Sequence, residues 1–314
     1  MKFIKTTDKV SGGEIKLNYF DYGQGKPVVM LHGWPVCKEM FEYQLQPLID
    51  AGLRVVAYDR RGFGKSDAPW SGYDYDTLTD DLKAVIDGLD LDDVTLVGFS
   101  MGGGEVARYF TRYGGAKVSK VVLISSVVPY LPQTDDNPNG VPQDKLQDMA
   151  NQAKDDRIGF LETFFKQFYG VSLVSHPVSN AFLQYNLTLA SLASGRATLE
   201  CMKAFAFTDF REDAVNINVP TLIIHGDSDK TVPIETSGQR AAEIIKNNQF
   251  VVYEGAPHGL HYTEKERLNQ DLVNFITGGN TYSMGFQPEA GATISDSDTT
   301  SIVLPSNGEG LVTR

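Results

Sequence analysis

The stretch from residue 94 to residue 113 constrains the fold of this chain more than any other part of the sequence. The apolar residues 94–97 predict a short buried strand, and residues 105–113 predict a helix. Between them stands Gly98-Phe99-Ser100-Met101-Gly102, which matches G-x-S-x-G. An abrupt turn from a strand into a helix needs a strained residue at its centre, and the two glycines remove side-chain atoms that would collide there. The pattern therefore predicts that Ser100 is a nucleophile held at the tip of a sharp turn.

Strands and helices alternate on both sides of this turn. Residues 14–22 alternate between polar and apolar, and continuous apolar runs predict buried strands at residues 27–31, 54–58, 120–125, 219–225 and 249–253. Helical spacing of apolar residues predicts helices at 39–49, 77–89, 235–245 and 266–276. The order predicts an α/β fold with a mostly parallel sheet and helices on both faces. The carboxyl ends of the strands then meet along one edge, where sites in such sheets lie.

Residues 129–217 interrupt this alternation. Four prolines open the segment, and helical patterns follow at residues 144–167, 179–192 and 197–207. We therefore expect an α/β core formed by residues 1–128 and 218–278, with a helical cap formed by residues 129–217. Residues 279–314 are rich in Gly, Ser, Thr and Asp, a composition that favours a disordered tail.

Composition limits the partners that such a chain can have. The net charge of −12 argues against nucleic acid and anionic membranes, because both would repel the protein. No apolar stretch is long enough to span a bilayer, and the first residues lack the apolar segment of a secretion signal. The two cysteines, Cys37 and Cys201, are far apart and in no metal-binding spacing. These features favour a cytoplasmic protein without a metal.

A serine nucleophile needs a base, and the chain contains five histidines. His258 is favoured because it follows the last strand, in a loop at the carboxyl edge of the sheet. His261 is the alternative, although its place at a helix start is more typical of a surface or supporting residue. His32 and His225 each precede a glycine in a tight turn, where we expect the rings to bond backbone groups.

The base needs a carboxylate, and two aspartates follow the strand at residues 219–225. Asp227 is expected to bond turn amides, whereas Asp229 reaches further toward the loop of His258. The order Ser100, Asp229, His258 agrees with that of G-x-S-x-G hydrolases. The negative oxygen of a tetrahedral intermediate also needs donors, and the backbone N–H groups of Met101 and Trp34 are the candidates.

The sequence resembles the α/β-hydrolase-fold arylesterases and cofactor-free haloperoxidases (perhydrolases). The resemblance runs from about Gly12 to Ile276 and rests on six segments: residues 32–35, 58–67, 98–108, 205–211, 225–233 and 256–259. It implies an α/β-hydrolase fold, a catalytic triad of Ser100, Asp229 and His258, and oxyanion donors at Trp34 and Met101. It also implies hydrolysis of small esters, with peracid formation and halide oxidation when hydrogen peroxide replaces water, without any cofactor. Members of this family often self-associate.

The substrate pocket is expected to be apolar, with residues from the core and the cap. Its candidate residues are Pro35, Phe99, Phe164, Phe168, Phe205, Thr231, Val232 and Leu260. Lys230-Thr231 and Leu260 depart from the residues usual in the family, which affects the shape of the pocket. In this family the proline at Pro35 accompanies the perhydrolase members, so we expect peracid formation here.

Other functions remain as alternatives to ester hydrolysis. Perhydrolysis, lactone hydrolysis or amide hydrolysis as the main activity would use the same residues. A ligand receptor of the same fold is a more distant alternative. A halide-displacing or epoxide enzyme would need a carboxylate at position 100, which the serine excludes.

Overall fold

A computed structural model describes residues 1–279 of the chain, and these residues contain an eight-stranded sheet. The strands are β1 (Lys2–Thr7), β2 (Glu14–Tyr22), β3 (Lys26–Leu31), β4 (Leu53–Tyr58), β5 (Val94–Phe99), β6 (Val118–Ile124), β7 (Thr221–Gly226) and β8 (Asn248–Tyr253). Their order across the sheet is β1-β2-β4-β3-β5-β6-β7-β8. The β1–β2 and β2–β4 pairs are antiparallel, and every pair from β4 to β8 is parallel. The predicted α/β-hydrolase fold is confirmed.

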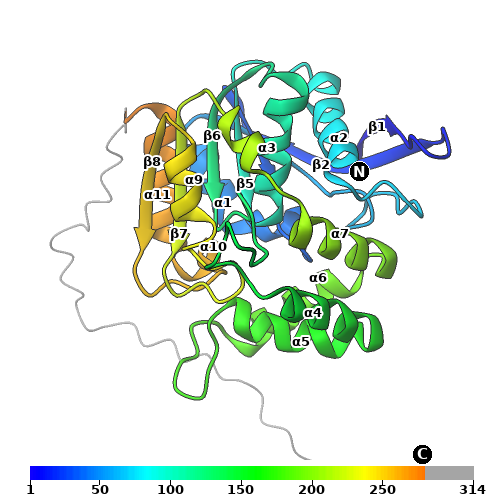
Figure 1. Cartoon of the computed structure of the whole chain (residues 1–314). Helices are drawn as coiled ribbons and strands as arrows, with labels where there is room; N and C mark the ends of the chain where they lie inside the picture. Colours follow the sequence, from blue (N-terminus) through cyan, green and yellow to red (C-terminus); the bar gives the residue numbers. More distant parts are fainter. Residues whose placement is uncertain (280–314) are drawn as a thin grey trace, which may run out of the picture. The chain divides into compact units, whose positions relative to one another are not determined.

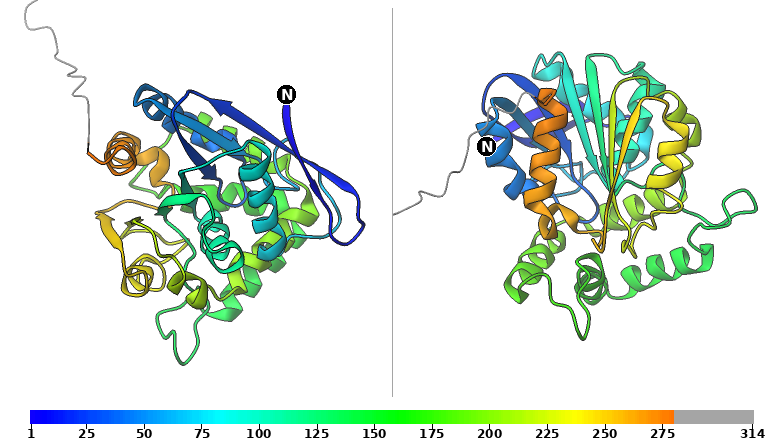
Figure 2. Two further views of the ribbon diagram at one scale, coloured as in Figure 1. Left: turned by 90° about the horizontal axis from the view of Figure 1, so that it is seen from above. Right: turned by 90° about the vertical axis from the view of Figure 1, so that its left-hand side faces the viewer.

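Helices cover both faces of the sheet (Figures 1 and 2). On one face α1 (Glu42–Asp50) packs against α10 (Leu260–Thr263) and α11 (Lys265–Thr277). On the other face α3 (Met101–Tyr113) packs against α2 (Tyr75–Gly88) and α8 (Arg211–Val215), and α8 contacts α9 (Gly238–Ile244). Every residue of β5 is buried, as its apolar sequence predicts for a strand covered on both faces.

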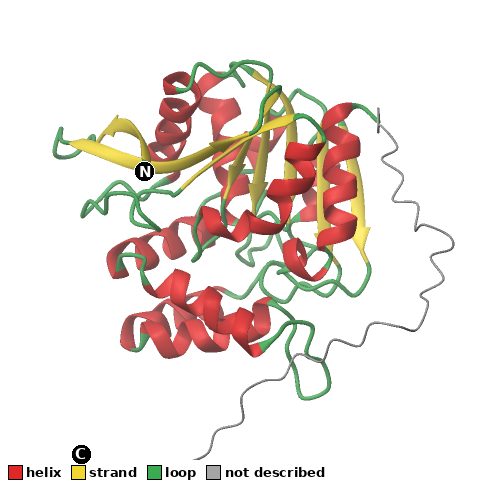
Figure 3. Ribbon diagram, turned by 180° about the vertical axis from the view of Figure 1, so that it is seen from behind, coloured by secondary structure: helices red, strands yellow, loops and turns green. Residues whose placement is uncertain are grey.

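Four further helices lie beyond the carboxyl ends of the parallel strands, below the sheet in Figure 1. They are α4 (Gln143–Asp155), α5 (Arg157–Phe168), α6 (Asn180–Ser191) and α7 (Gly195–Phe207). We call them the cap helices. Figure 3 shows that this part of the described chain is helical and connected by loops. The division into core and cap stays a prediction, and the predicted tail at 279–314 lies outside the described residues, apart from Gly279.

Some predicted elements differ from the structure. The helix predicted at 144–167 is two helices, because Asp156 leaves the helical conformation and its carboxylate caps α5 by accepting from the Gly159 N–H at 3.0 Å. The helix predicted at 39–49 begins as the 3-10 helix η1 (Lys38–Phe41) and continues as α1 through Pro47. The helix after the G-x-S-x-G motif begins at Met101, earlier than predicted, and β1 and α8 were not predicted.

Candidate active site

Ser100 stands between β5 and α3 with φ 52° and ψ −117°, a conformation that L-residues rarely adopt. A Cβ atom at Gly98 would lie 2.7 Å from the backbone of Gly103, and one at Gly102 would overlap the carbonyl oxygen of Leu31. The two glycines of the motif are therefore required by the close approach of backbone on both sides of the turn. The strained turn directs the Ser100 hydroxyl toward the loop that follows β8.

Three side chains from three strand ends lie in hydrogen-bond contact. The distance from Ser100 Oγ to His258 Nε2 is 3.0 Å, and that from His258 Nδ1 to Asp229 Oδ2 is 2.6 Å. Ser100 is 6% exposed, and His258 and Asp229 are also buried. A neutral imidazole that donates from Nδ1 to Asp229 has its Nε2 free to accept the serine proton.

Asp229 accepts hydrogen bonds on both of its oxygens. Oδ1 accepts from the N–H groups of Thr231 and Val232, each at 2.8 Å. Oδ2 faces His258 and also lies 3.3 Å from His225 Nε2. Burial alone would raise the pKa of this carboxyl, but the attraction of His258 and the hydrogen bonds of His225 and His258 outweigh burial and hold the pKa well below its usual value. Asp229 is therefore an anion at neutral pH.

The loop after β3 passes directly over Ser100. A Cβ atom at Gly33 would lie 3.2 Å from the Cβ of Ser100, so the next backbone N–H, that of Trp34, is near the serine. Among the described residues, the Trp34 N–H has no hydrogen-bond partner. Met101 is the first residue of α3, where the N–H has no partner within the helix. Both N–H groups can therefore donate to an oxygen placed beside Ser100.

Aromatic rings surround these residues. Trp34 packs against Phe164 and Phe205 of the cap helices, with ring centroids 5.1 and 5.6 Å apart. Phe99 and Phe168 pack against the ring of His258 at 5.3 and 4.8 Å. The structure thus brings these predicted pocket residues together around Trp34 and His258, and it adds Phe160, whose ring lies 6.3 Å from Trp34.

The other predicted pocket residues lie close to the same elements. Thr231 and Val232 contact Asp229 through their backbone N–H groups. Leu260 is the first residue of α10, and Pro35 follows Trp34. Val232, Leu260 and Pro35 are buried. The indole N–H of Trp34 donates to Thr198 O of α7 at 2.9 Å, which joins the loop to a cap helix.

The remaining histidines of this edge are buried. His261 was expected at the surface or in a supporting position; it is buried and packs against Phe99 at 4.9 Å. Burial, followed by the charge of His258, lowers the pKa of His261 to about 3. His32 bonds backbone groups as expected: Nδ1 donates to Gly33 O at 2.9 Å, and Nε2 accepts from the Arg60 N–H at 2.9 Å.

Two functional contacts were not foreseen from the sequence. His225 was expected to bond only backbone, and its Nε2 does contact Val232 O at 2.9 Å, but it also faces the Asp229 carboxylate. Its place four residues before Asp229 is visible in the sequence, although the direction of its ring is not. The buried pair Arg60 and Glu105 lies beside the loop after β3, and nothing in the spacing of the two residues indicates that they meet.

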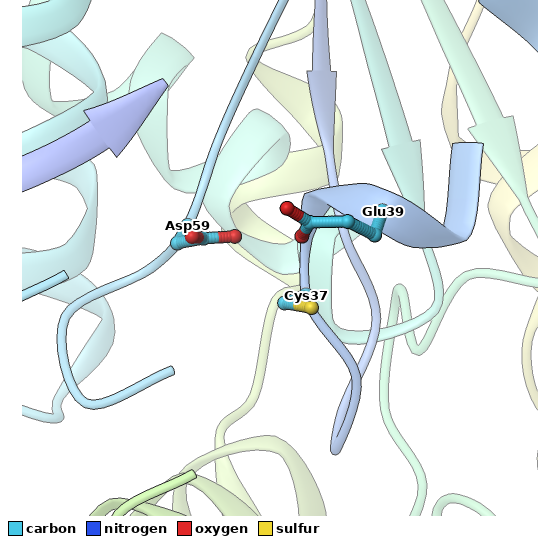
Figure 4. A group of neighbouring side chains, drawn as sticks. All are labelled: Cys37, Glu39 and Asp59. Carbon is cyan, nitrogen blue, oxygen red and sulfur yellow. The ribbon is translucent and has the colours of Figure 1, made fainter. Parts of the chain in front are cut away.

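A separate cluster joins Cys37, Glu39 and Asp59 (Figure 4), whose possible ligand atoms lie within 4.8 Å of one another. Lys38 Nζ already forms ion pairs with Glu39 at 2.9 Å and Asp59 at 2.8 Å. Burial, followed by the nearby carboxylates, raises the pKa of the Cys37 thiol far above its usual value. Because the lysine already pairs with both acids and the thiol keeps its proton, we interpret the cluster as a structural ion-pair network.

Comparison with known proteins agrees with this geometry. Residues 26–265 match the alpha/beta hydrolase fold family. A bifunctional esterase/perhydrolase of Acinetobacter calcoaceticus is 38% identical over 88% of this chain and 99% of its own length. A non-heme chloroperoxidase of Kitasatospora aureofaciens is 39% identical over 83% and 96%. The crystal structure of a bromoperoxidase from Bacillus anthracis superposes with a TM-score of 0.84 at 45% identity, covering 88% of this chain and 99% of that one.

The chain therefore belongs to the α/β hydrolase fold family and is a hydrolase enzyme. The resemblance to the esterase and cofactor-free haloperoxidase group is confirmed. Within residues 1–279, none of the helices has the length and apolar character needed to cross a membrane.

Proposed function

We propose that this enzyme hydrolyses small carboxylic esters through an acyl-enzyme on Ser100, with His258 as base and Asp229 as its orienting acid. The observation that carries the proposal is the chain of contacts from Ser100 Oγ to His258 Nε2 at 3.0 Å and from His258 Nδ1 to Asp229 Oδ2 at 2.6 Å. Such a chain lets a neutral serine attack at neutral pH, because its proton passes to the imidazole during the attack.

In the first half of the reaction, Ser100 Oγ attacks the ester carbonyl carbon and its proton moves to His258 Nε2. The carbonyl oxygen becomes negative and accepts hydrogen bonds from the N–H groups of Trp34 and Met101. His258 then gives the proton to the leaving alcohol, and the acyl group remains on Ser100. Asp229 stays ionised throughout and stabilises the protonated His258, as its low pKa supports.

In the second half, water attacks the acyl group while His258 takes the proton, and the carboxylic acid leaves. Hydrogen peroxide attacks in the same way and releases a peracid, which oxidises halides outside the enzyme. The relatives named as esterase/perhydrolase and non-heme chloroperoxidase support this second outcome. Pro35 follows the oxyanion donor Trp34, and we propose that it determines whether water or peroxide attacks the acyl-enzyme.

The surroundings of Ser100 support small, uncharged acyl groups. Ser100 is 6% exposed, and the rings of Trp34, Phe164 and Phe168 lie close by. A buried aromatic wall favours apolar acyl chains and offers nothing to balance a charge on the substrate.

The proposal is tested with a panel of p-nitrophenyl esters of increasing acyl length, with and without hydrogen peroxide. We expect the fastest turnover for short chains, and peracetic acid when acetate and peroxide are supplied. Ser100→Ala should reduce turnover to the background rate, since it removes the hydroxyl that contacts His258 and carries the acyl group in the proposed mechanism. Activity that survives in this variant would show that Ser100 is not the nucleophile.

Pro35→Leu tests the perhydrolase part separately. We expect this variant to keep ester hydrolysis and to form less peracetic acid than the wild type. An equal yield in the two proteins would remove Pro35 from the assignment without affecting the role of Ser100.

A further inference from the structure

A buried ion pair lies beside the loop after β3 (residues 32–35), which we call the oxyanion loop because it carries the proposed donor Trp34. Arg60, just after β4, and Glu105, in the second turn of α3, are both 1% exposed. Arg60 Nε donates to Glu105 Oε1 at 2.7 Å, and the Tyr58 hydroxyl donates to Glu105 Oε2 at 3.1 Å. The pair thus connects the end of β4 to the helix that begins directly after Ser100.

Arg60 also holds the residue that begins the oxyanion loop. Its Nη2 donates to His32 O at 2.8 Å, and its backbone N–H donates to His32 Nε2 at 2.9 Å. Because Nε2 accepts this bond, the proton of a neutral His32 is on Nδ1. Arg60 therefore fixes both the position and the tautomer of His32.

His32 in turn fixes one particular peptide group. Its Nδ1 donates to Gly33 O at 2.9 Å. Gly33 O and Trp34 N–H belong to the same trans peptide, in which the carbonyl and the N–H point in opposite directions. A hydrogen bond that holds Gly33 O on one side therefore aims the Trp34 N–H to the other side, where Ser100 lies.

We propose that Arg60 and Glu105, acting through His32, are positioning residues that set the direction and spacing of the two oxyanion donors. Glu105 is in the same helix as Met101, and Arg60 joins this helix to the loop of Trp34. One ion pair thus connects the elements that carry the two N–H groups. This inference rests on the proposed function, since it assumes that these N–H groups receive the negative oxygen.

The chain contains a matched control for this pair. Arg61 is the next residue, is equally buried, and donates to Asp81 of α2 through Nε at 2.6 Å and Nη2 at 2.7 Å. Within residues 1–279, Arg61 makes no hydrogen bond to the oxyanion loop. Loss of this pair should affect stability to a similar degree and leave the Trp34 peptide in place.

The experiment compares two double variants, Arg60→Met with Glu105→Gln and Arg61→Met with Asp81→Asn. Replacing both partners avoids leaving one buried charge unpaired, and the glutamine keeps an acceptor for Tyr58. We expect the first variant to lower kcat for p-nitrophenyl acetate by about 10- to 100-fold, less than the complete loss of a donor, with KM changed by less than about threefold. The control should keep kcat within about threefold of the wild type.

A second measurement does not depend on activity. The chain has two tryptophans, so protein labelled with ¹⁵N-tryptophan gives two backbone amide signals, from Trp34 and Trp70. We expect the Arg60/Glu105 variant to shift the Trp34 amide signal and speed its hydrogen exchange, with the Trp70 signal unchanged. The control variant should leave both signals in place.

Several outcomes would overturn the inference. The inference fails if the Trp34 signal is unchanged in the Arg60/Glu105 variant. It also fails if the two double variants lose kcat equally, or if the Trp34 signal shifts while kcat stays at the wild-type value. If Ser100→Ala retained wild-type turnover, the proposed function would fail instead, while the Trp34 amide would still report whether Arg60 and Glu105 hold the loop.

Discussion

Asp229 shows how one buried charge is supported by its neighbours. Two backbone N–H groups bind one carboxylate oxygen, and His258 and His225 face the other. Because Nε2 of His225 lies near Val232 O and Asp229 Oδ2, which are both acceptors, a neutral His225 carries its proton on Nε2. His225 thus keeps the carboxylate directed at His258.

Replacing His225 tests this role. His225→Leu removes the donor, and we expect kcat for short esters to fall about tenfold, as is typical when a residue that orients a catalytic group is lost. His225→Gln is the matched control, because its side-chain N–H₂ can take the place of Nε2 and should recover most of the activity. Similar rates in the leucine and glutamine variants would contradict the assignment.

His261 should contribute to the pH dependence of stability. Its pKa is about 3 in the folded protein, against 6.5 for an unperturbed histidine, so between these values the unfolded chain binds the extra proton. Protonation of the unfolded chain therefore costs the folded protein no stability above about pH 6.5, and it lowers the free energy of unfolding progressively as pH falls toward 3. Between pH 7 and pH 5 this effect of His261 lowers the free energy of unfolding by about 2 kcal/mol.

His261→Phe removes this contribution while keeping an aromatic ring against Phe99 and Phe168. Urea unfolding at pH 7 and pH 5 should therefore show a smaller loss of stability on acidification in the variant, by about 2 kcal/mol. His32 also has a lowered pKa caused by burial, so some pH dependence remains in the variant. Parallel pH profiles for the two proteins would show that His261 does not titrate in this way.

At the scale of elements, the turn around Ser100 depends on close backbone approach. Gly102, in the first turn of α3, leaves no room for a side chain, because a Cβ atom would overlap the carbonyl of Leu31 in β3. Gly195 also lies in the first turn of a helix, at the start of α7. A Cβ atom there would have room, because the nearest atom is Arg157 Nε at 3.8 Å.

The same substitution should therefore have opposite effects at these two glycines. Gly102→Ala forces backbone apart, and we expect it to destabilise the protein by about 1–3 kcal/mol and to lower activity. Gly195→Ala should stabilise it by about 0.4–1 kcal/mol, because it restricts the unfolded chain and favours the helix. Thermal unfolding of both variants measures this difference, and equal effects would contradict it.

Local sequence patterns predicted the central strands well and the peripheral elements poorly. The strands β3 to β7 are mostly apolar and bounded by turns, so their burial is visible in the sequence. The strand at residues 249–253 was predicted to be buried as well, but β8 lies at the edge of the sheet and only its Tyr253 is buried. β1 depends on its pairing with β2, and the residues 2–7 carry little apolar pattern of their own. The break at Asp156 was missed because apolar spacing continues through it, although the capping signal Asp156-x-x-Gly159 is local.

At the scale of the molecule, the cap helices and the sheet meet at Trp34. The described residues lie in one compact unit, and Trp34 joins the loop after β3 to α5 and α7 through ring contacts and the bond to Thr198. The residues at the strand ends could be predicted because topology places them on one edge. The aromatic contacts could not, since they depend on how the cap helices are oriented.

Trp34 therefore reports the contact between cap helices and sheet. Trp70 is 75% exposed, so Trp70→Phe should cost little stability and leaves Trp34 as the single tryptophan. We expect Trp34 fluorescence and far-UV circular dichroism to give the same urea midpoint, as one cooperative unit requires. A tryptophan transition at lower urea would show that the cap helices separate before the sheet unfolds.

The burial of the two cysteines has a consequence for the proposed reaction with hydrogen peroxide. Peroxide and peracids attack thiolates much faster than thiols. Burial raises the pKa of the Cys201 thiol to about 12 despite the opposing charge of Arg60, and the pKa of the Cys37 thiol is raised further. Both sulfurs therefore keep their protons and lie away from solvent. The packing that stabilises the fold should therefore also protect both thiols from hydrogen peroxide, the co-substrate proposed above.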